Sequence, residues 1–384
     1  MAPGSPFDRV VARTRGLGAA LAAGLVLAGC ASDEPVPVRS TMSPAQARAM
    51  VAKALPPGLT DRQGWATDIY AGLSAVQIPV NPSNACAVVA IIEQESSFRA
   101  NPSVPGLPAI AWREIDAKAQ RAGVPGLVVR AALLLPSPNG RSYSERIDSA
   151  TTEKDLSDVF EDFIGMVPLG KRFFGDANPV RTGGPMQVSI AWAQAYVATR
   201  PYPYPGAENI RREVFTRRGG LYFGIAHLLD YPASYDRPLY RFADFNAGHH
   251  ASRNAAFQNA VSIVSGVPLA LDGDLIQHGA AGDTPIGATE AAVRVIGARI
   301  GQRPEAIRSA LEQGGSPQFA RTPLYARVFE LADRAEGRPV PRALVPRIQL
   351  KSPKITRDLT TEWFARRVDE RHQRCVARVG DPAS

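Results

Sequence analysis

The residue best placed for acid–base chemistry in this 384-residue chain is Glu95. It ends an apolar run, and at 3.6 residues per turn it shares one helix face with Val88, Ile91 and Ile92. We expect aliphatic neighbours and the negative end of a helix dipole to raise the pKa of its carboxyl group. Such an acid keeps its proton near neutral pH and can donate it to a leaving group. The alternative interpretation is a glutamate that merely ends a helix at the surface.

Three separated motifs carry a family resemblance. Glu95–Phe98 reads Glu-Ser-Ser-Phe, Gly184–Gln187 reads Gly-Pro-Met-Gln, and Phe245–Gly248 reads Phe-Asn-Ala-Gly. In this order they resemble the Glu-Ser-x-Phe, Gly-Leu-Met-Gln and Tyr-Asn-Ala-Gly motifs of lytic transglycosylases with the lysozyme-like fold. We call them the first, second and third motifs.

The resemblance implies a substrate and a mechanism. Lytic transglycosylases cleave the β-1,4 bond between N-acetylmuramic acid and N-acetylglucosamine in peptidoglycan and leave 1,6-anhydro-muramyl ends, with no cofactor and no metal. One carboxylate serves both steps, unlike the carboxylate pair of most glycosidases. The catalytic residue would be Glu95, and the substrate-binding residues would be Ser96, Met186, Gln187, Phe245 and Asn246.

The chain departs from the family pattern in two ways. Gln187 lies 92 positions after Glu95, so a helical insertion at about residues 100–181 separates the first two motifs. This insertion could wall or cover the substrate groove, or pack outside it. Phe245 stands where the family has Tyr, which removes a hydroxyl group near the acid. The alternative function is therefore a catalytically impaired glycan-binding or envelope-scaffold protein.

An acidic residue and two histidines flank the third motif. Asp244 is the acidic residue beside it, and we interpret it as a loop-capping residue rather than a second catalytic carboxylate. His249 and His250 form a pair, but no Cys is nearby, so we predict no metal site. His227 falls in an apolar helical stretch and is predicted to be a core residue.

Helical periodicity dominates the chain, and alternating strand patterns are scarce. This predicts a mainly α protein: a lysozyme-like domain over residues 43–270, interrupted by the insertion, and a helical basic extension over residues 285–384. Ser83 or Asn84 is expected to cap the helix that ends at Glu95.

The first residues resemble the signal of a bacterial lipoprotein. A positive region is followed by a short apolar stretch, and residues 27–30 read Leu-Ala-Gly-Cys, as in a lipobox. We therefore expect residues 1–29 to be removed, Cys30 to carry lipid, and residues 30–42 to form a tether. Because Ala31 and Ser32 follow the cysteine, and not Asp, the outer membrane, facing the periplasm, is the predicted location.

Charge and the remaining cysteines fit an exported protein. The net charge of +8 falls to +6 without residues 1–29, and residues 337–380 hold eleven Lys and Arg against four Asp and Glu. This basic segment would either contact an acidic polymer or lipid, or be a solvated helix face. Nucleic acid is not an expected partner, and protein partners are not predicted. Cys86 and Cys375 would pair in an oxidising compartment, or else remain two buried thiols.

Overall fold

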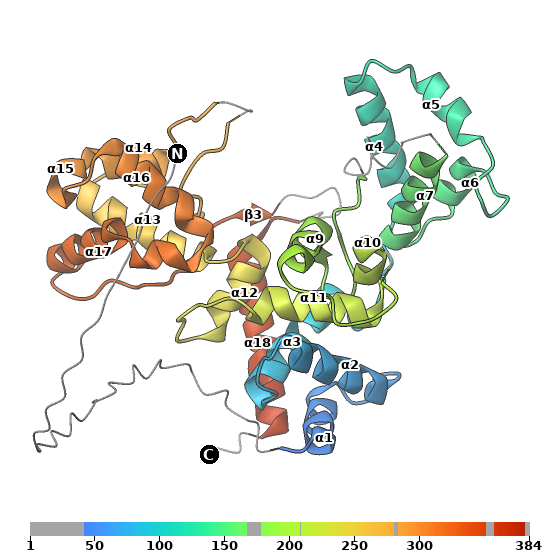
Figure 1. Ribbon diagram of the computed structural model, residues 1–384, viewed down its shortest axis with the longest axis horizontal. Helices are drawn as coiled ribbons and strands as arrows, with labels where there is room; N and C mark the ends of the chain where they lie inside the picture. The colour runs from blue at the N-terminus through green and yellow to red at the C-terminus, as the bar shows by residue number, and fades with distance from the viewer. Residues whose placement is uncertain (1–41, 167–177, 208, 280–282, 351–356, 381–384) are drawn as a thin grey trace, which may run out of the picture. The chain divides into compact units, whose positions relative to one another are not determined.

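The computed structural model describes residues 42–166, 178–207, 209–279, 283–350 and 357–380 (Figure 1). Within these ranges it contains seventeen α-helices and two short antiparallel strand pairs, which confirms the mainly α class. No helix there is long and apolar enough to cross a bilayer. The predicted signal peptide, Cys30 and the tether lie outside the described residues, apart from Met42.

The largest group of buried apolar side chains, here called the main core, draws on helices from both ends of the chain. Figure 1 shows α18 (red) beside α3 near the labels α11 and α12, and contacts join α18 to both α3 and α12. The helices of this part are α1 (Pro44–Ala54), α2 (Arg62–Ala75), α3 (Pro82–Glu95), α9 (Ile190–Thr199), α10 (Ile210–Val214), α11 (Arg217–Leu229), α12 (Pro238–Ala247) and α18 (Thr361–Val379).

Helix α3 is the most deeply buried element near the candidate site. Asn81 caps it by accepting a hydrogen bond from the amide of Asn84, and Pro82 occupies the first helical position. The helix therefore starts earlier than a cap at Ser83 or Asn84 would place it. All eight residues of 85–92 are buried, as their small or aliphatic side chains allow.

Helix α18 was expected in a C-terminal extension, but it belongs to the main core. Its buried residues recur every three or four positions, which gives one apolar face, and they include Phe364, Val368, Cys375 and Val379. A 2.04 Å disulfide joins Cys375 to Cys86 near the start of α3. The structure thus contains the predicted bridge, and the last described helix completes the core around α3.

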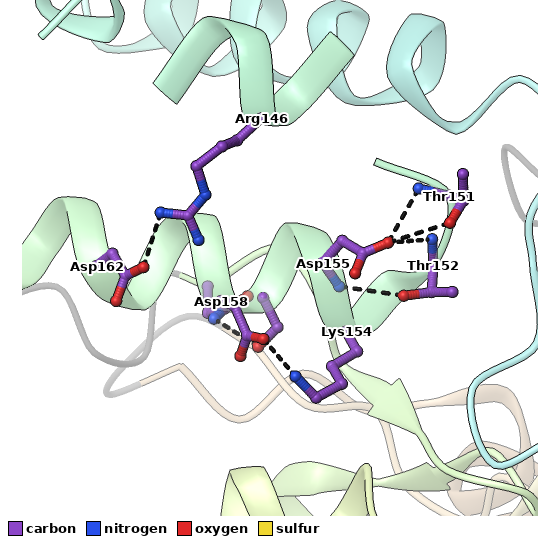
Figure 2. Close-up of polar contacts among 9 residues, drawn as sticks. Arg146, Thr151, Thr152, Lys154, Asp155, Asp158 and Asp162 are labelled. Carbon is purple, nitrogen blue, oxygen red and sulfur yellow. Dashed lines mark hydrogen bonds and ion pairs between the residues drawn. The ribbon is translucent and has the colours of Figure 1, made fainter. Parts of the chain in front are cut away.

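The insertion has a small core of its own. It contains α4 (Leu107–Arg121), α5 (Gly126–Leu133), α6 (Tyr143–Asp148) and α7 (Glu153–Gly165). Figure 2 shows the polar contacts at α7: Thr152 and Asp155 form a capping box, and Arg146 on α6 pairs with Asp162 at 2.7 Å. Five buried side chains form the insertion core: Ala111, Leu133, Tyr143, Ile147 and Val159.

A third group of buried side chains, the C-terminal core, is built by α13 (Ala251–Ser265), α14 (Ala288–Val295), α15 (Gly297–Ile300), α16 (Pro304–Leu311) and α17 (Pro323–Glu336). Helix α13 therefore packs with the helices that follow it, so this division starts earlier in the chain than the predicted boundary at residues 270–285. All three cores fall within one compact unit, Ser40–Ser384.

Candidate functional site

The predicted acid, Glu95, is the last residue of α3 and is half-buried. The two residues before it are held by α18, because Arg371 donates to Glu93 at 3.1 Å and to Gln94 at 2.7 Å. Ser96 is buried, and its hydroxyl donates to the carbonyl oxygen of Ile92 at 3.1 Å. In the structure, Ser96 therefore closes the last turn of the helix that carries Glu95.

The backbone of the first motif turns sharply after Glu95. Ser97 and Phe98 adopt φ values of 49° and 61°, in the left-handed region that side chains other than glycine rarely occupy. Phe98 packs edge-on against Trp65 of α2, with ring centroids 5.4 Å apart. The guanidinium of Arg217, at the start of α11, lies 5.3 Å from the centre of the same Trp65 ring. The first motif thus reaches α11 through one intervening side chain.

The second motif forms the turn between β1 (Thr182–Gly183) and β2 (Val188–Ser189). Gln187 has φ 50°, and its side-chain amide donates to the carbonyl oxygen of Gly184 at 3.1 Å. A Cβ at Gly184 would lie 2.2 Å from the carbonyl oxygen of Val214, and one at Gly183 would lie 2.4 Å from the ring of Phe215. These glycines are therefore needed for close packing against the chain itself.

Two residues of the second motif also rest on α11. Met186 is fully buried, and a Cβ at Gly224 would lie 2.4 Å from its sulfur. Pro185 meets α11 one turn earlier, where a Cβ at Gly220 would lie 2.5 Å from its Cδ. Met186 thus packs between the turn and α11. Gln187, which is half-buried, lies on the side of the turn that faces the surface of the protein.

The third motif ends α12. The ring of Phe245 lies 5.1 Å from the ring of His227 on α11. Asn246 is exposed, and its side-chain oxygen accepts a 2.9 Å hydrogen bond from Thr361 at the start of α18. Gly248 has φ 107°, and a Cβ added there would meet nothing within 4 Å. Here the glycine is required by the backbone conformation and not by crowding.

Asp244, the acidic residue beside the third motif, acts as a cap. Its carboxylate accepts bonds from the amides of His250 at 3.0 Å and Ser252 at 2.7 Å, at the start of α13. It also accepts from the hydroxyls of Tyr231 at 3.0 Å and Tyr235 at 2.7 Å. Burial raises the pKa of Asp244, and these hydrogen bonds oppose the shift. The contacts agree with the predicted capping role.

The histidines near the third motif pack against other rings. Burial lowers the pKa of His227 to about 3 and that of His250 to about 3, and it also lowers the pKa of His249. The rings of His227 and His249 stack at 4.5 Å, and Trp192 lies 4.7 Å from His227. Among the residues that the structure describes, no group of three or more His, Cys, Asp or Glu is arranged to hold a metal.

Helix α11 is the element that connects the three motifs. In order along it, Arg217 leads to the first motif, Gly220 and Gly224 contact the second, and His227 contacts the third. Helix α18 makes a second connection, from the end of α3 to Asn246. The sequence signal for α11 was its spacing of Gly220, Gly224 and His227, which places small residues and a histidine on one face.

Left-handed residues concentrate at the same motifs. The described chain has six non-glycine residues with positive φ, and three of them lie inside the first two motifs: Ser97, Phe98 and Gln187. A fourth, His250, follows the third motif by two positions. Such conformations cost free energy and persist where surrounding structure enforces them, often at functional sites.

Comparison with known proteins places the chain in a family. The sequence model described as "Protein of unknown function (DUF1615)" matches residues 58–378. The chain belongs to the DUF1615 family. The matched range spans the insertion and all but the last residue of α18.

An uncharacterized protein from Escherichia coli (strain K12), YaiW, is 52% identical over 356 residues, which cover 93% of this chain and 96% of YaiW. No solved structure matches the chain. The Cys86–Cys375 bridge is typical of oxidising compartments and indicates an extracytoplasmic location. Neither the family description nor the relative's name specifies an activity.

Proposed function

We propose that this DUF1615 protein is a peptidoglycan lytic transglycosylase with a lysozyme-like catalytic domain. The observation that supports the proposal is that three motifs, far apart in sequence, pack along α11, the first through Trp65 and the other two directly, with left-handed backbone in or beside each of them. In this proposal the protein is a lipoprotein anchored through Cys30 to the outer membrane and facing the peptidoglycan of the periplasm.

Glu95 would act first as an acid and then as a base. Its carboxyl proton passes to the glycosidic oxygen as that oxygen leaves the anomeric carbon of the muramyl residue. The ionised carboxylate then takes the proton of the muramyl 6-hydroxyl, whose oxygen bonds to the anomeric carbon. The bond to N-acetylglucosamine breaks, the 1,6-anhydro ring forms, and Glu95 regains its proton.

Gln187 and Asn246 are the polar groups of the second and third motifs that lie nearest the surface. Gln187 is held in a left-handed turn by its own bond to Gly184, and Asn246 is fixed by Thr361. We assign these two side chains to the orientation of sugar hydroxyl or acetamido groups. Ser96, Met186 and Phe245 would support them through packing, since the first two are buried and the third rests on His227.

The test is digestion of purified peptidoglycan by the full chain and by Glu95→Gln. Loss of a general acid lowers rates by roughly 10²–10⁴-fold, so the variant should release at least about 100-fold less 1,6-anhydro product. Glu93→Gln is the matched control, because Glu93 lies on the same helix but pairs with Arg371. It should keep the activity. Equal product release by wild type and Glu95→Gln contradicts the assignment, and reducing ends without the anhydro ring indicate hydrolysis instead.

A second candidate is a non-catalytic glycan-binding protein. Phe245 favours it. Lytic transglycosylases have a tyrosine at this position of the motif, whereas Phe245 has no hydroxyl group and its ring lies against that of His227. This candidate predicts that wild type and Glu95→Gln both sediment with peptidoglycan and that neither releases product. Under the enzyme proposal, only the variant fails to release it.

A further inference from the structure

The insertion exposes an unusual amount of apolar surface at α5. Ten large apolar side chains in the described chain are exposed, and half of them fall within residues 124–135. Leu127 is 84% exposed, Leu134 68% and Val128 57%. A helix that is apolar on all sides is normally buried on all sides, so this surface indicates an additional contact.

The inner side of α5 already has partners. Leu133 is buried in the insertion core, and Val129 packs against it. Arg130 pairs with Asp116 of α4 at 2.9 Å, and its guanidinium lies 4.6 Å from the centre of the Trp112 ring. These contacts fix the orientation of α5, so its other side is held outward.

The outward side forms one continuous stripe. On a helix with 3.6 residues per turn, positions 127, 128 and 131 share a face opposite Val129 and Leu133, and Leu134 and Leu135 follow directly after the helix ends. All five are exposed, and each is Ala, Val or Leu. The stripe contains no side chain that could form a hydrogen bond with a protein partner.

The sequence around this stripe is mainly basic, although Arg130 pairs with Asp116 of α4. Residues 118–141 contain four basic residues, Lys118, Arg121, Arg130 and Arg141, and no Asp or Glu. An apolar stripe bordered by basic residues is the pattern of helices that lie in the interface of an anionic bilayer. A groove for another protein would more often combine apolar and mixed polar groups.

The proposed anchor would hold the described body close to a membrane. Residues 30–42 comprise thirteen residues, which span at most about 45 Å when fully extended. The described body begins where this tether ends. A second contact on the same molecule would strengthen this attachment by raising the effective concentration of the body at the bilayer.

We propose that α5 and the residues around it form a second membrane contact, in which Leu127, Val128 and Leu134 enter the headgroup region of an anionic phospholipid bilayer. This contact goes beyond the proposed glycan chemistry and does not depend on it. It would hold the insertion at the membrane surface while the lipid holds the N-terminus.

The first experiment places a fluorescent probe in the full chain. Leu127→Cys is labelled with an environment-sensitive dye and bound to vesicles of phosphatidylethanolamine and phosphatidylglycerol with brominated acyl chains. The control is Val295→Cys on α14, a site that is 68% exposed and also apolar. We expect a blue shift and at least twofold bromine quenching at position 127, and neither at position 295.

Three results would overturn the proposal. They are equal quenching at both positions, no quenching at either, or a blue shift at position 127 that grows with protein density without bromine quenching. The last result would assign the stripe to contact between two copies of the chain.

The second experiment removes the expected lipid anchor. The body beginning at Ser40 holds all three cores, so it can be tested alone by flotation with the same vesicles. Leu127→Asp/Leu134→Asp should lower vesicle binding at least tenfold, while Val295→Asp should not. Binding should also weaken at high salt and on neutral phosphatidylcholine vesicles. Unchanged binding by the double variant, with an unchanged unfolding midpoint, contradicts the proposal.

Discussion

The main core and the insertion differ in how completely they bury their apolar side chains. In α3, eight successive residues are buried, and a disulfide fixes the helix against α18. In α5, the described structure buries Leu133 and leaves most other apolar residues exposed. Tight packing holds the candidate acid and its motifs in place, whereas the exposed stripe is available for contact outside the molecule.

The largest difference in stability should come from the cross-link. The Cys86–Cys375 bridge closes a loop over a sequence separation of 289, and the chain-entropy model assigns such a loop about 5 kcal/mol. The double variant Cys86→Ser/Cys375→Ser should therefore lose about 4–5 kcal/mol of unfolding free energy in guanidinium titrations.

An ion pair in the insertion provides the comparison for the stability of the double cysteine variant. This exposed pair, Arg130 with Asp116, should contribute at most about 1 kcal/mol, so Asp116→Asn is expected to change stability little. Reducing agent should lower the midpoint of the wild type and leave the double cysteine variant unchanged. A similar loss for Asp116→Asn and for the cysteine variant would remove the distinction between the two regions.

The pH dependence should also separate the two regions, because residues 100–181 contain no histidine. The folded pKa of His250 is about 3, against an ordinary value of 6.5, so between these values the unfolded chain binds more protons. Stability is therefore complete above about pH 6.5 and falls as the pH drops towards 3.

The test of this pH dependence is His250→Asn, since asparagine tolerates the left-handed backbone at φ 66°. The variant should reduce the pH slope of the unfolding free energy by up to about 1.4 kcal/mol per pH unit. Urea titrations at pH 7 and pH 4.5 measure it. An unchanged slope would show that His250 takes up its proton at the same pH in the folded protein as in the unfolded chain.

A pair of glycine substitutions should give smaller effects than loss of the disulfide. In α11, Gly224→Ala places a Cβ 2.4 Å from the sulfur of Met186, and overpacking of this kind costs about 1–3 kcal/mol. In α5, Gly126→Ala meets nothing within 4 Å and should be neutral or stabilising by up to about 1 kcal/mol. Thermal unfolding of both variants, compared with wild type, measures the contrast. Equal effects would show that α11 can shift away from the second motif.

Local patterns predicted a large part of this molecule. Helical periodicity gave the mainly α class and the helix that ends at Glu95, and two cysteines in an exported chain suggested the bridge. These features depend on neighbouring residues or on the chemistry of one residue type. The capping role of Asp244 also followed from its position before a turn.

Other features depend on contacts between distant segments. Phe364 and Val368 form a regular apolar stripe, but nothing in that stripe states that its partner is α3, almost 300 residues earlier. The spacing of Gly220 and Gly224 marks a face of small residues, but it does not state that the second motif packs against that face. The sequence did not predict the exposure of Leu127, because an apolar residue in a helix is normally expected to be buried.

The position of α18 has a consequence for how the chain folds as it is synthesised. A chain that is synthesised from its N-terminus completes α3 long before α18, the helix that covers it. Until then the apolar side of α3 stays open, and Cys86 has no partner. The core around α3 can therefore close only after α18 has been made, and a chain cut before Thr361 would leave it open.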